Sequence, residues 1–154
     1  MIHPYDDLPL HQSSAPLLHP TSDSAGLYDR YFFNGFDRNG EVFFAVALGV
    51  YPNRQVMDSS FSVVVDGVQH NCRSSRRCSS DRTVTTVGSI DVQVIEPMLR
   101  HRIVIDDHHG ISADLTMQVI SPVIEEPTFV RRNEGRVVMD YTRITQFVEW
   151  SGWI

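Results

Sequence analysis

The sequence contains no lysine, and this absence limits the chemistry that the protein can perform. All thirteen basic residues of the 154-residue chain are arginine. A Schiff-base mechanism and a lysine general base are therefore excluded. The nineteen acidic residues give a formal net charge of -6. We expect neither a nucleic acid nor an anionic membrane surface as the main partner, because both attract clustered positive charge.

Long apolar runs are also missing. No stretch approaches the roughly 18 uninterrupted apolar residues of a membrane-spanning helix. The first ten residues, MIHPYDDLPL, have neither the basic nor the apolar region of a signal peptide. We therefore expect a cytoplasmic protein with no membrane span. The composition, 42% hydrophobic and 21% charged, is typical of a globular domain with a sizeable core.

Cysteine is scarce, and its spacing argues against a disulfide. Cys72 and Cys78 both lie in the stretch NCRSSRRCSS. If this stretch is one extended strand, the two residues are roughly 20 Å apart, far beyond disulfide reach. We predict two free thiols. A Cys/His metal site would need more ligands at closer spacing, so neither a metal nor a cofactor is expected.

No segment shows a helical hydrophobic period over eleven residues, and we expect fewer than one residue in ten in α-helix. From Tyr28 onward, apolar runs are separated by short turns, among them the Asn39-Gly40 step that suits a tight hairpin. About nine or ten strands are expected. This pattern favours an all-β antiparallel meander over residues 27–154, closed as a barrel or folded as a sandwich. Residues 1–26, rich in proline and serine, are expected to form an extended arm on this domain.

The alternation of side chains distinguishes the two faces of several strands. In residues 41–50 the even positions hold large apolar side chains, whereas the last three odd positions hold the small residues Ala45, Ala47 and Gly49. That face suits either the close approach of another backbone or space for a ligand. In residues 137–149, taken as one strand, Arg143 interrupts an apolar column. A buried, unpaired arginine would be unfavourable, so Arg143 is either paired or on a wet face, in a hydrated cavity or on an exposed strand.

No catalytic motif of high specificity is present: we find no phosphate-binding loop, no H-E-x-x-H and no nucleophile elbow. The stretch of residues 106–110, Asp-Asp-His-His-Gly, has the composition of a turn. His70 and His101 stand alone in polar-flanked strands and indicate no site. The densest polar cluster, Tyr51 to Asp58, follows a buried strand, where the mouth of a barrel would meet a bound molecule. The alternative is an ordinary turn.

Several segments together carry a resemblance to a known family. They are YDRYFFNGFDRNGEVFFAVALGVYPNRQVMDSSFSVVVDG, the later EEP, and MDYTRITQFVEWSGW. This pattern resembles a bacterial calycin-like family of unknown function, related to hydroxyneurosporene synthase (carotenoid hydratase) and AttH-like proteins. The resemblance covers residues 28–153 and implies two lipocalin-like β lobes that hold a hydrophobic ligand, sometimes with cofactor-free acid chemistry. Such chains continue into a second lobe, so this one resembles the N-terminal lobe, as a shortened member or a fragment.

From these observations we expect a lipocalin-like barrel or strongly curved sandwich that binds a small apolar or amphipathic ligand. We predict that Arg54 pairs with Asp58 or Asp140 and fixes the Tyr-Pro-Asn-Arg stretch as the rim of the site. The candidate ligand-binding residues are Tyr51, Asn53, Arg54, Asp58, Asp140, Tyr141 and Arg143.

Two other functions are compatible with the same sequence. One is a cofactor-free hydratase or isomerase acting on a terpenoid-like or polyketide-like substrate. There Asp58 or Asp140 would protonate an alkene, its pKa raised by desolvation. The other is a structural half-module that pairs with a second β lobe or a second copy of the chain. Trp150 and Trp153 would then supply the apolar contact.

Overall fold

The computed structural model describes residues 4–9, 25–79, 81 and 83–154, and all structural statements concern these residues. They form thirteen strands and two short 3-10 turns, with no α-helix. The predicted all-β antiparallel class and its low helix content are confirmed. The strands are β1 (Asp29–Phe36), β2 (Val42–Tyr51), β3 (Val56–Val65), β4 (Val68–Arg77), β5 (Thr86–Val87), β6 (Ile90–Glu96), β7 (Arg100–His108), β8 (Ile111–Val119), β9 (Ile124–Glu125), β10 (Phe129–Asn133), β11 (Arg136–Tyr141), β12 (Ile144–Thr145) and β13 (Val148–Trp153).

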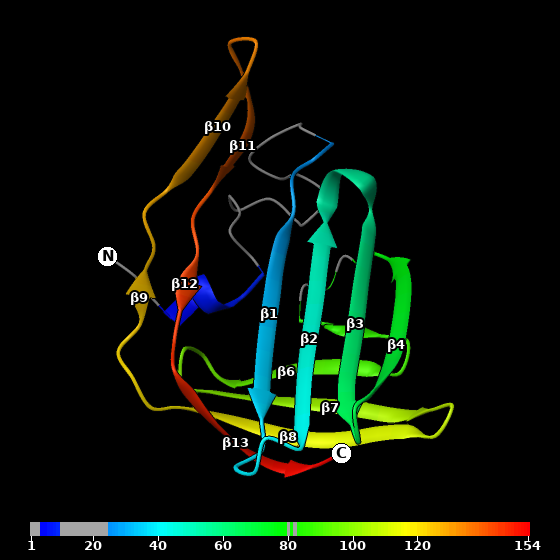
Figure 1. The fold of residues 1–154 in the computed structure, drawn as a ribbon. Coiled ribbons are helices and arrows are strands. Elements are labelled where there is room, and N and C mark those ends of the chain that lie inside the picture. The colour runs from blue at the N-terminus through cyan, green and yellow to red at the C-terminus, as the bar shows by residue number, and fades with distance from the viewer. Residues whose placement is uncertain (1–3, 10–24, 80, 82) are drawn as a thin grey trace.

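Two antiparallel sheets make up the body of the molecule. The first sheet has the order β1-β2-β3-β4, and the second has the order β13-β8-β7-β6-β5. Figure 1 shows the strands of one sheet running across those of the other, as in crossed sheet packing. The sheet order leaves β1 and β4 as the edges of the first sheet, and β13 and β5 as the edges of the second.

The core lies between the sheets and follows from the alternation of the strands. In β2 the large apolar side chains at the even positions from Phe44 to Val50 are buried, because they face the second sheet. The second sheet contributes the alternating positions of its own strands, such as Ile103 and Ile105 in β7. The small odd face of β2 is therefore the outer face of the first sheet, where Phe43 is exposed.

Side chains link the two sheets at both sides. On one side, Trp150 of β13 packs edge-on against Phe44 at 4.9 Å between ring centroids, and its Nε1–H donates to the carbonyl oxygen of Asn34 at 3.0 Å. On the other side, the Arg76 guanidinium donates to the carbonyl oxygens of Thr86 and Val84 at 2.6 and 2.8 Å. These contacts hold the two sheets together where no backbone ladder does.

Between β8 and β13, residues 124–145 form a projection that we call the arm. It is distinct from the extended N-terminal arm expected over residues 1–26. It contains the β9–β12 pair and the β10–β11 hairpin, which extends away from the two sheets in Figure 1. The single strand expected over residues 137–149 is wrong: it is divided among β11, β12 and β13. One break falls at Gln146, whose side chain turns to donate to the carbonyl oxygen of Met98 at 3.0 Å. Arg143 is both exposed and paired, with Glu126 at 2.6 Å.

The first residues of the chain contribute one described segment to the fold. It contains a 3-10 turn, η1 (Pro4–Asp7), which lies between β12 and β1 in Figure 1. Asp7 is buried there, 8% exposed. Of the predicted arm over residues 1–26, only residues 4–9 and 25–26 are described, and the others lie outside the described residues.

The prediction of two free cysteines is confirmed. Cys72 is buried in β4, with its Sγ 3.3 Å from the Ser89 hydroxyl, and Cys78 follows the end of that strand. The described residues include no helix long and apolar enough to cross a membrane.

Candidate functional site

The Tyr-Pro-Asn-Arg stretch forms a tight connection between β2 and β3. Residues Pro52–Arg54 are a 3-10 turn that ends at Gln55, in the left-handed conformation at φ 54°, and Asn53 is partly buried within it. Arg54 is exposed, and its Nε–H donates to the carbonyl oxygen of Ala25 at 2.8 Å. Among the described ion pairs, none joins Arg54 to Asp58 or Asp140. The predicted pairing of Arg54 does not form.

Tyr51 and Asp58 meet on the outer face of the first sheet. The Tyr51 hydroxyl hydrogen-bonds to Asp58, and burial together with the charge of Asp58 raises the pKa of Tyr51. Gly49 is the direct partner of Asp58 in the ladder, and a Cβ at Gly49 would lie 2.8 Å from Asp58 Oδ1. The smallest residue on this face therefore makes room for the Tyr51–Asp58 contact. The Tyr28 ring lies against the Tyr51 ring in a tilted arrangement, with 5.7 Å between ring centroids.

The other three predicted site residues lie on the arm. Asp140 is exposed, Tyr141 packs on Phe129 at 5.2 Å between ring centroids, and the Arg143 guanidinium lies 5.8 Å from the Tyr141 ring. No hydrogen bond, ion pair or ring contact given for the described residues joins these three side chains to Tyr51, Arg54 or Asp58. The structure thus divides the predicted site into two separate surface groups.

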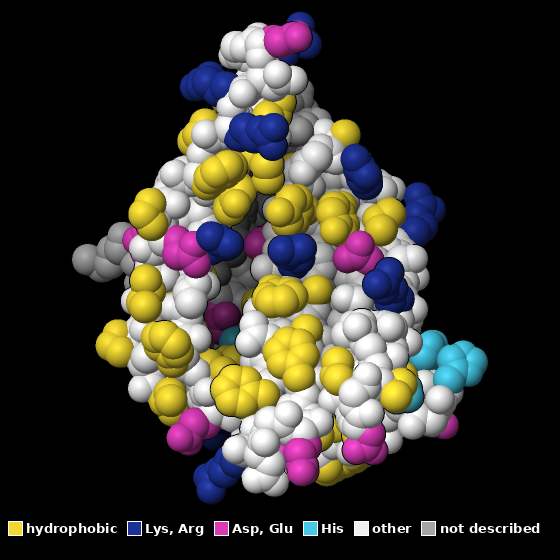
Figure 2. Space-filling view, in the orientation of Figure 1, with side chains coloured by type: hydrophobic (Ala, Val, Ile, Leu, Met, Phe, Trp, Pro, Cys, Tyr) yellow, Lys and Arg dark blue, Asp and Glu magenta, His cyan; other side chains and the backbone are white. Residues whose placement is uncertain are grey.

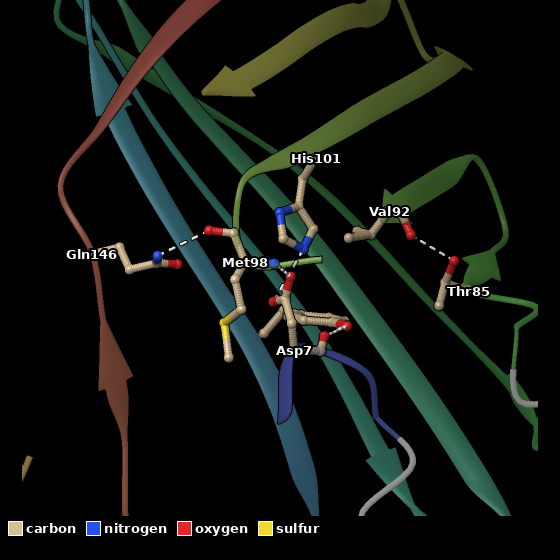
Figure 3. Close-up of polar contacts among 7 residues, drawn as sticks. Asp7, Thr85, Val92, Met98, His101 and Gln146 are labelled. Atoms are coloured by element: carbon tan, nitrogen blue, oxygen red, sulfur yellow. Dashed lines mark hydrogen bonds and ion pairs between the residues drawn. The ribbon is translucent and has the colours of Figure 1, made fainter. Parts of the chain in front are cut away.

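A different polar cluster lies inside the molecule, between the two sheets (Figure 3). His101 of β7 is 1% exposed and shares its face of the strand with Ile103 and Ile105. Its Nε2 lies 3.3 Å from Oδ1 of Asp7, which enters from η1. The backbone N–H of Met98 donates to the other oxygen of the same carboxylate. The carboxylate of the N-terminal turn is therefore contacted by two groups, the Met98 N–H and the His101 ring, that follow it by more than 90 positions in the sequence.

Aromatic side chains of the first sheet surround this pair. The rings of Tyr31 and Phe33 in β1 lie 5.7 and 5.3 Å from the His101 ring, measured between centroids. The Tyr31 hydroxyl donates to the backbone carbonyl oxygen of Asp7. Burial, followed by the negative charges of Asp7 and Asp29, raises the pKa of Tyr31, so the phenol stays protonated and remains a donor.

The His101 ring is not fully satisfied by its neighbours. Neither ring nitrogen has a hydrogen-bond partner within the described part of the chain. The contact of Nε2 with Asp7 meets the distance for an ion pair, yet it lacks the alignment of a hydrogen bond. A buried imidazole of this kind usually has a structural or functional explanation.

A pocket of about 410 Å³ lies beside this cluster, between the N-terminal segment and the β5–β6 end of the second sheet. Val94, one of its lining residues, is the direct ladder partner of His101. Cross-strand partners project from the same face, so the pocket and the imidazole are neighbours. The lining residues are Leu8, Pro9, Thr83, Val84, Thr85, Thr86, Asp91, Gln93 and Val94.

A second pocket, of about 290 Å³, lies at the C-terminal strand between Phe36 and Trp153. Figure 2 shows a further hollow in the surface between β12 and β1. Acidic (magenta) and histidine (cyan) side chains are visible at the bottom of this hollow. Within the described residues, no three histidine, cysteine or acidic side chains are grouped so that they could hold a metal ion.

The sequence interpretation missed the internal cluster. His101 could have been found, because odd positions 101, 103 and 105 form one face of a strand whose other members are isoleucine. A histidine in an apolar column predicts a buried imidazole. Asp7 carried no such signal, since the partners of its carboxylate, Met98 and His101, are 91 or more positions away.

Comparison with known proteins identifies the family. The family described as "Family of unknown function (DUF8625)" matches residues 2–154. The chain belongs to this family. No curated protein and no solved structure matches the chain. The family description names no activity, so we infer the function from the geometry of the site.

Proposed function

We propose that this DUF8625 protein binds a small amphipathic molecule in the pocket between the N-terminal segment and the β5–β6 edge. The observation that carries this proposal is the pocket of about 410 Å³ beside a buried, partly unsatisfied histidine. Small-molecule sites are typically about 300–1,000 Å³, mostly apolar, with a few polar groups that fix orientation. The volume of this pocket is within that range, and its lining combines apolar and polar side chains.

The polar side chains that line the pocket are held by hydrogen bonds within the second sheet. Asp91 accepts hydrogen bonds from the Thr86 hydroxyl at 2.9 Å and from the Gln93 amide at 2.7 Å. The buried Thr85 hydroxyl donates to the carbonyl oxygen of Val92. Leu8 and Val94 offer apolar surface on the side of the imidazole. A ligand with an apolar body and one polar end matches this arrangement.

The proposal includes the lipocalin-like architecture that we expected from the sequence. Two crossed antiparallel sheets around an apolar core are compatible with an opened barrel. A ligand held by such a lobe is what the resemblance to the hydroxyneurosporene synthase and AttH-like group implies. The proposal moves the site, however, from the Tyr51 turn to the pocket at the β5–β6 edge.

Displacement of a neutral fluorescent probe tests this proposal. N-phenyl-1-naphthylamine should bind the wild-type protein with enhanced emission, and decanol should displace it. Val94→Trp fills the pocket and should weaken probe binding at least about tenfold, which is about 1.4 kcal/mol. Ile120→Trp adds the same ring at an exposed position outside the pocket and should leave the affinity within about twofold. Equal binding by both variants would reject the pocket.

For the hydratase alternative, the two candidate acids were Asp58 and Asp140, and neither has the buried environment that this reaction needs. Asp140 is exposed on the arm, and Asp58 is hydrogen-bonded by Tyr51 on the outer face of the first sheet. Neither carboxyl group lies in the desolvated site that alkene protonation would need. Among the described residues, the buried carboxyl group is that of Asp7.

The half-module is a second candidate function, and the arm favours it. Both strands of the β10–β11 hairpin carry exposed apolar side chains, including Phe129, Val138 and Met139. An isolated hairpin is marginally stable in water, so a second copy covering it would stabilise it. Trp150 is already used in the core, whereas Trp153 is 57% exposed. Sedimentation equilibrium should then show a dimer that Val138→Glu dissociates, and a monomer at all concentrations would reject this candidate.

A further inference from the structure

The Asp7 carboxylate is bound by groups from the rest of the protein, the Met98 N–H and the His101 ring, which together we call the receptor. One oxygen accepts the Met98 N–H, and the other lies 3.3 Å from Nε2 of His101. Tyr31 holds the segment by donating to the Asp7 carbonyl oxygen. All three contacts come from the two sheets and the β6–β7 turn, whereas Asp7 belongs to a single 3-10 turn near the chain start. The receptor therefore belongs to the body of the fold, and its occupant is a short segment.

The turn that carries Met98 directs its N–H toward the Asp7 carboxylate and not into the turn. The Leu99 N–H closes the turn by donating to the carbonyl oxygen of Glu96 at 3.0 Å, with Pro97 second and Met98 third at φ 66°. This is the arrangement of a type II turn, in which the third position favours glycine. A methionine there is strained, because L-residues rarely adopt this left-handed conformation. Gln146 fixes the turn through the Met98 carbonyl oxygen, so the N–H is held in place before any anion binds.

His101 indicates that Asp7 does not use this receptor fully. The imidazole is buried, and neither nitrogen makes a hydrogen bond within the described residues. An unsatisfied buried polar group is destabilising, because it has given up its hydrogen bonds to water and gained none in return. A carboxylate that approached Nε2 along the ring plane would remove this penalty, and a charge-assisted bond is stronger than a neutral one. The short backbone of η1 limits how Asp7 can approach, whereas a free molecule has no such limit.

We propose that the Met98 N–H and His101 form a binding site for the carboxylate of an amphipathic monocarboxylate, and that Asp7 occupies this site in its place. The ligand displaces the Asp7 side chain and lays its apolar chain along Val94 in the adjacent pocket. This inference rests on the proposed function and names its ligand class. The Asp7 carboxylate acts as an internal competitor that sets the affinity.

Decanoate and decanol test the inference, because they share a chain and differ in the head group. In the displacement assay, the wild-type protein should bind decanoate about tenfold more tightly than decanol. Asp7→Ala removes the competitor and should tighten decanoate binding by a further factor of about ten, with decanol unchanged. Glu41→Ala removes one negative charge from an exposed position and should change neither affinity. His101→Phe keeps an aromatic ring and should abolish the preference for decanoate.

The outcomes separate this inference from the proposed function. If decanol binds and Val94→Trp blocks it, but decanoate has no advantage, the pocket stands and the carboxylate site is rejected. If neither amphiphile binds, both proposals are rejected. Should Asp7→Ala fail to fold, ¹H–¹⁵N spectra of the wild-type protein decide: decanoate, and not decanol, should shift the Met98 amide resonance. An unmoved Met98 resonance at saturating decanoate would overturn the inference.

Discussion

At the scale of single residues, Asp37 shows how one carboxylate fixes a hairpin. Its Oδ1 accepts the N–H groups of Glu41 and Val42 at 2.8 and 2.9 Å, and its Oδ2 accepts that of Asn39 at 3.2 Å. These backbone bonds, that of Val42 above all, favour the charged form and lower the pKa of Asp37. The turn between β1 and β2, which the Asn39-Gly40 step predicted, is thus held by the residue that precedes it.

This geometry predicts a pH-dependent effect of Asp37→Asn. Because the folded pKa is lower than the unfolded value of about 3.9, the carboxylate stabilises the fold above that pH. Its contribution is lost as the pH falls through the folded pKa. We expect Asp37→Asn to lower the thermal midpoint at pH 7, and the difference from wild type to narrow below about pH 4. Glu41→Gln, with the same change of charge, is the control. A difference of equal size at pH 7 and pH 3 would contradict this account.

At the scale of elements, the last strand depends on a glycine that no side chain can replace. Gly152 of β13 pairs with Leu115 of β8 at φ 132°, a conformation that L-residues rarely adopt. A Cβ there would overlap the carbonyl oxygen of Asp114 and lie 3.0 Å from the Leu115 Cα. Since both contacts are with backbone, no side-chain rotation relieves them.

Alanine substitution of two glycines separates backbone strain from this overlap. Gly110, in the β7–β8 turn at φ 84°, has open space around it, so Gly110→Ala should cost only the strain of about 1 kcal/mol. Gly152→Ala should cost about 1–3 kcal/mol more, because β13 must shift on β8. Urea unfolding of both variants measures the difference. Equal losses would show that β13 moves freely at this edge.

At the scale of the whole molecule, Trp150 joins the sheets that the backbone leaves separate. It packs on Phe44 and Phe33 and bonds to Asn34, all in the first sheet, while its own strand belongs to the second. Trp153, three positions later, is 57% exposed. The two tryptophans of the Trp-Ser-Gly-Trp stretch therefore have different roles.

Truncation of each tryptophan tests this division. Trp150→Ala should lower the free energy of unfolding by about 3–5 kcal/mol, the usual loss for a large core aromatic. Trp153→Ala should change it by less than about 1 kcal/mol, as for other exposed side chains. Urea unfolding followed by circular dichroism provides both values. A loss at Trp153 as large as that at Trp150 would indicate that a second copy covers it in solution.

The sequence by itself determined the all-β class, the alternation of large and small side chains in β2, the first hairpin and the free thiols. Each of these depends on local information: side-chain alternation, turn residues, or the distance along one extended strand. The tertiary structure alone decided which of the candidate residues lie together. It separated Tyr51 and Asp58 from Asp140 and Arg143, because the chain between β8 and β13 leaves the sheets as an arm. It also brought Asp7 to His101, a contact that arises only when β7 and β1 close around the N-terminal turn.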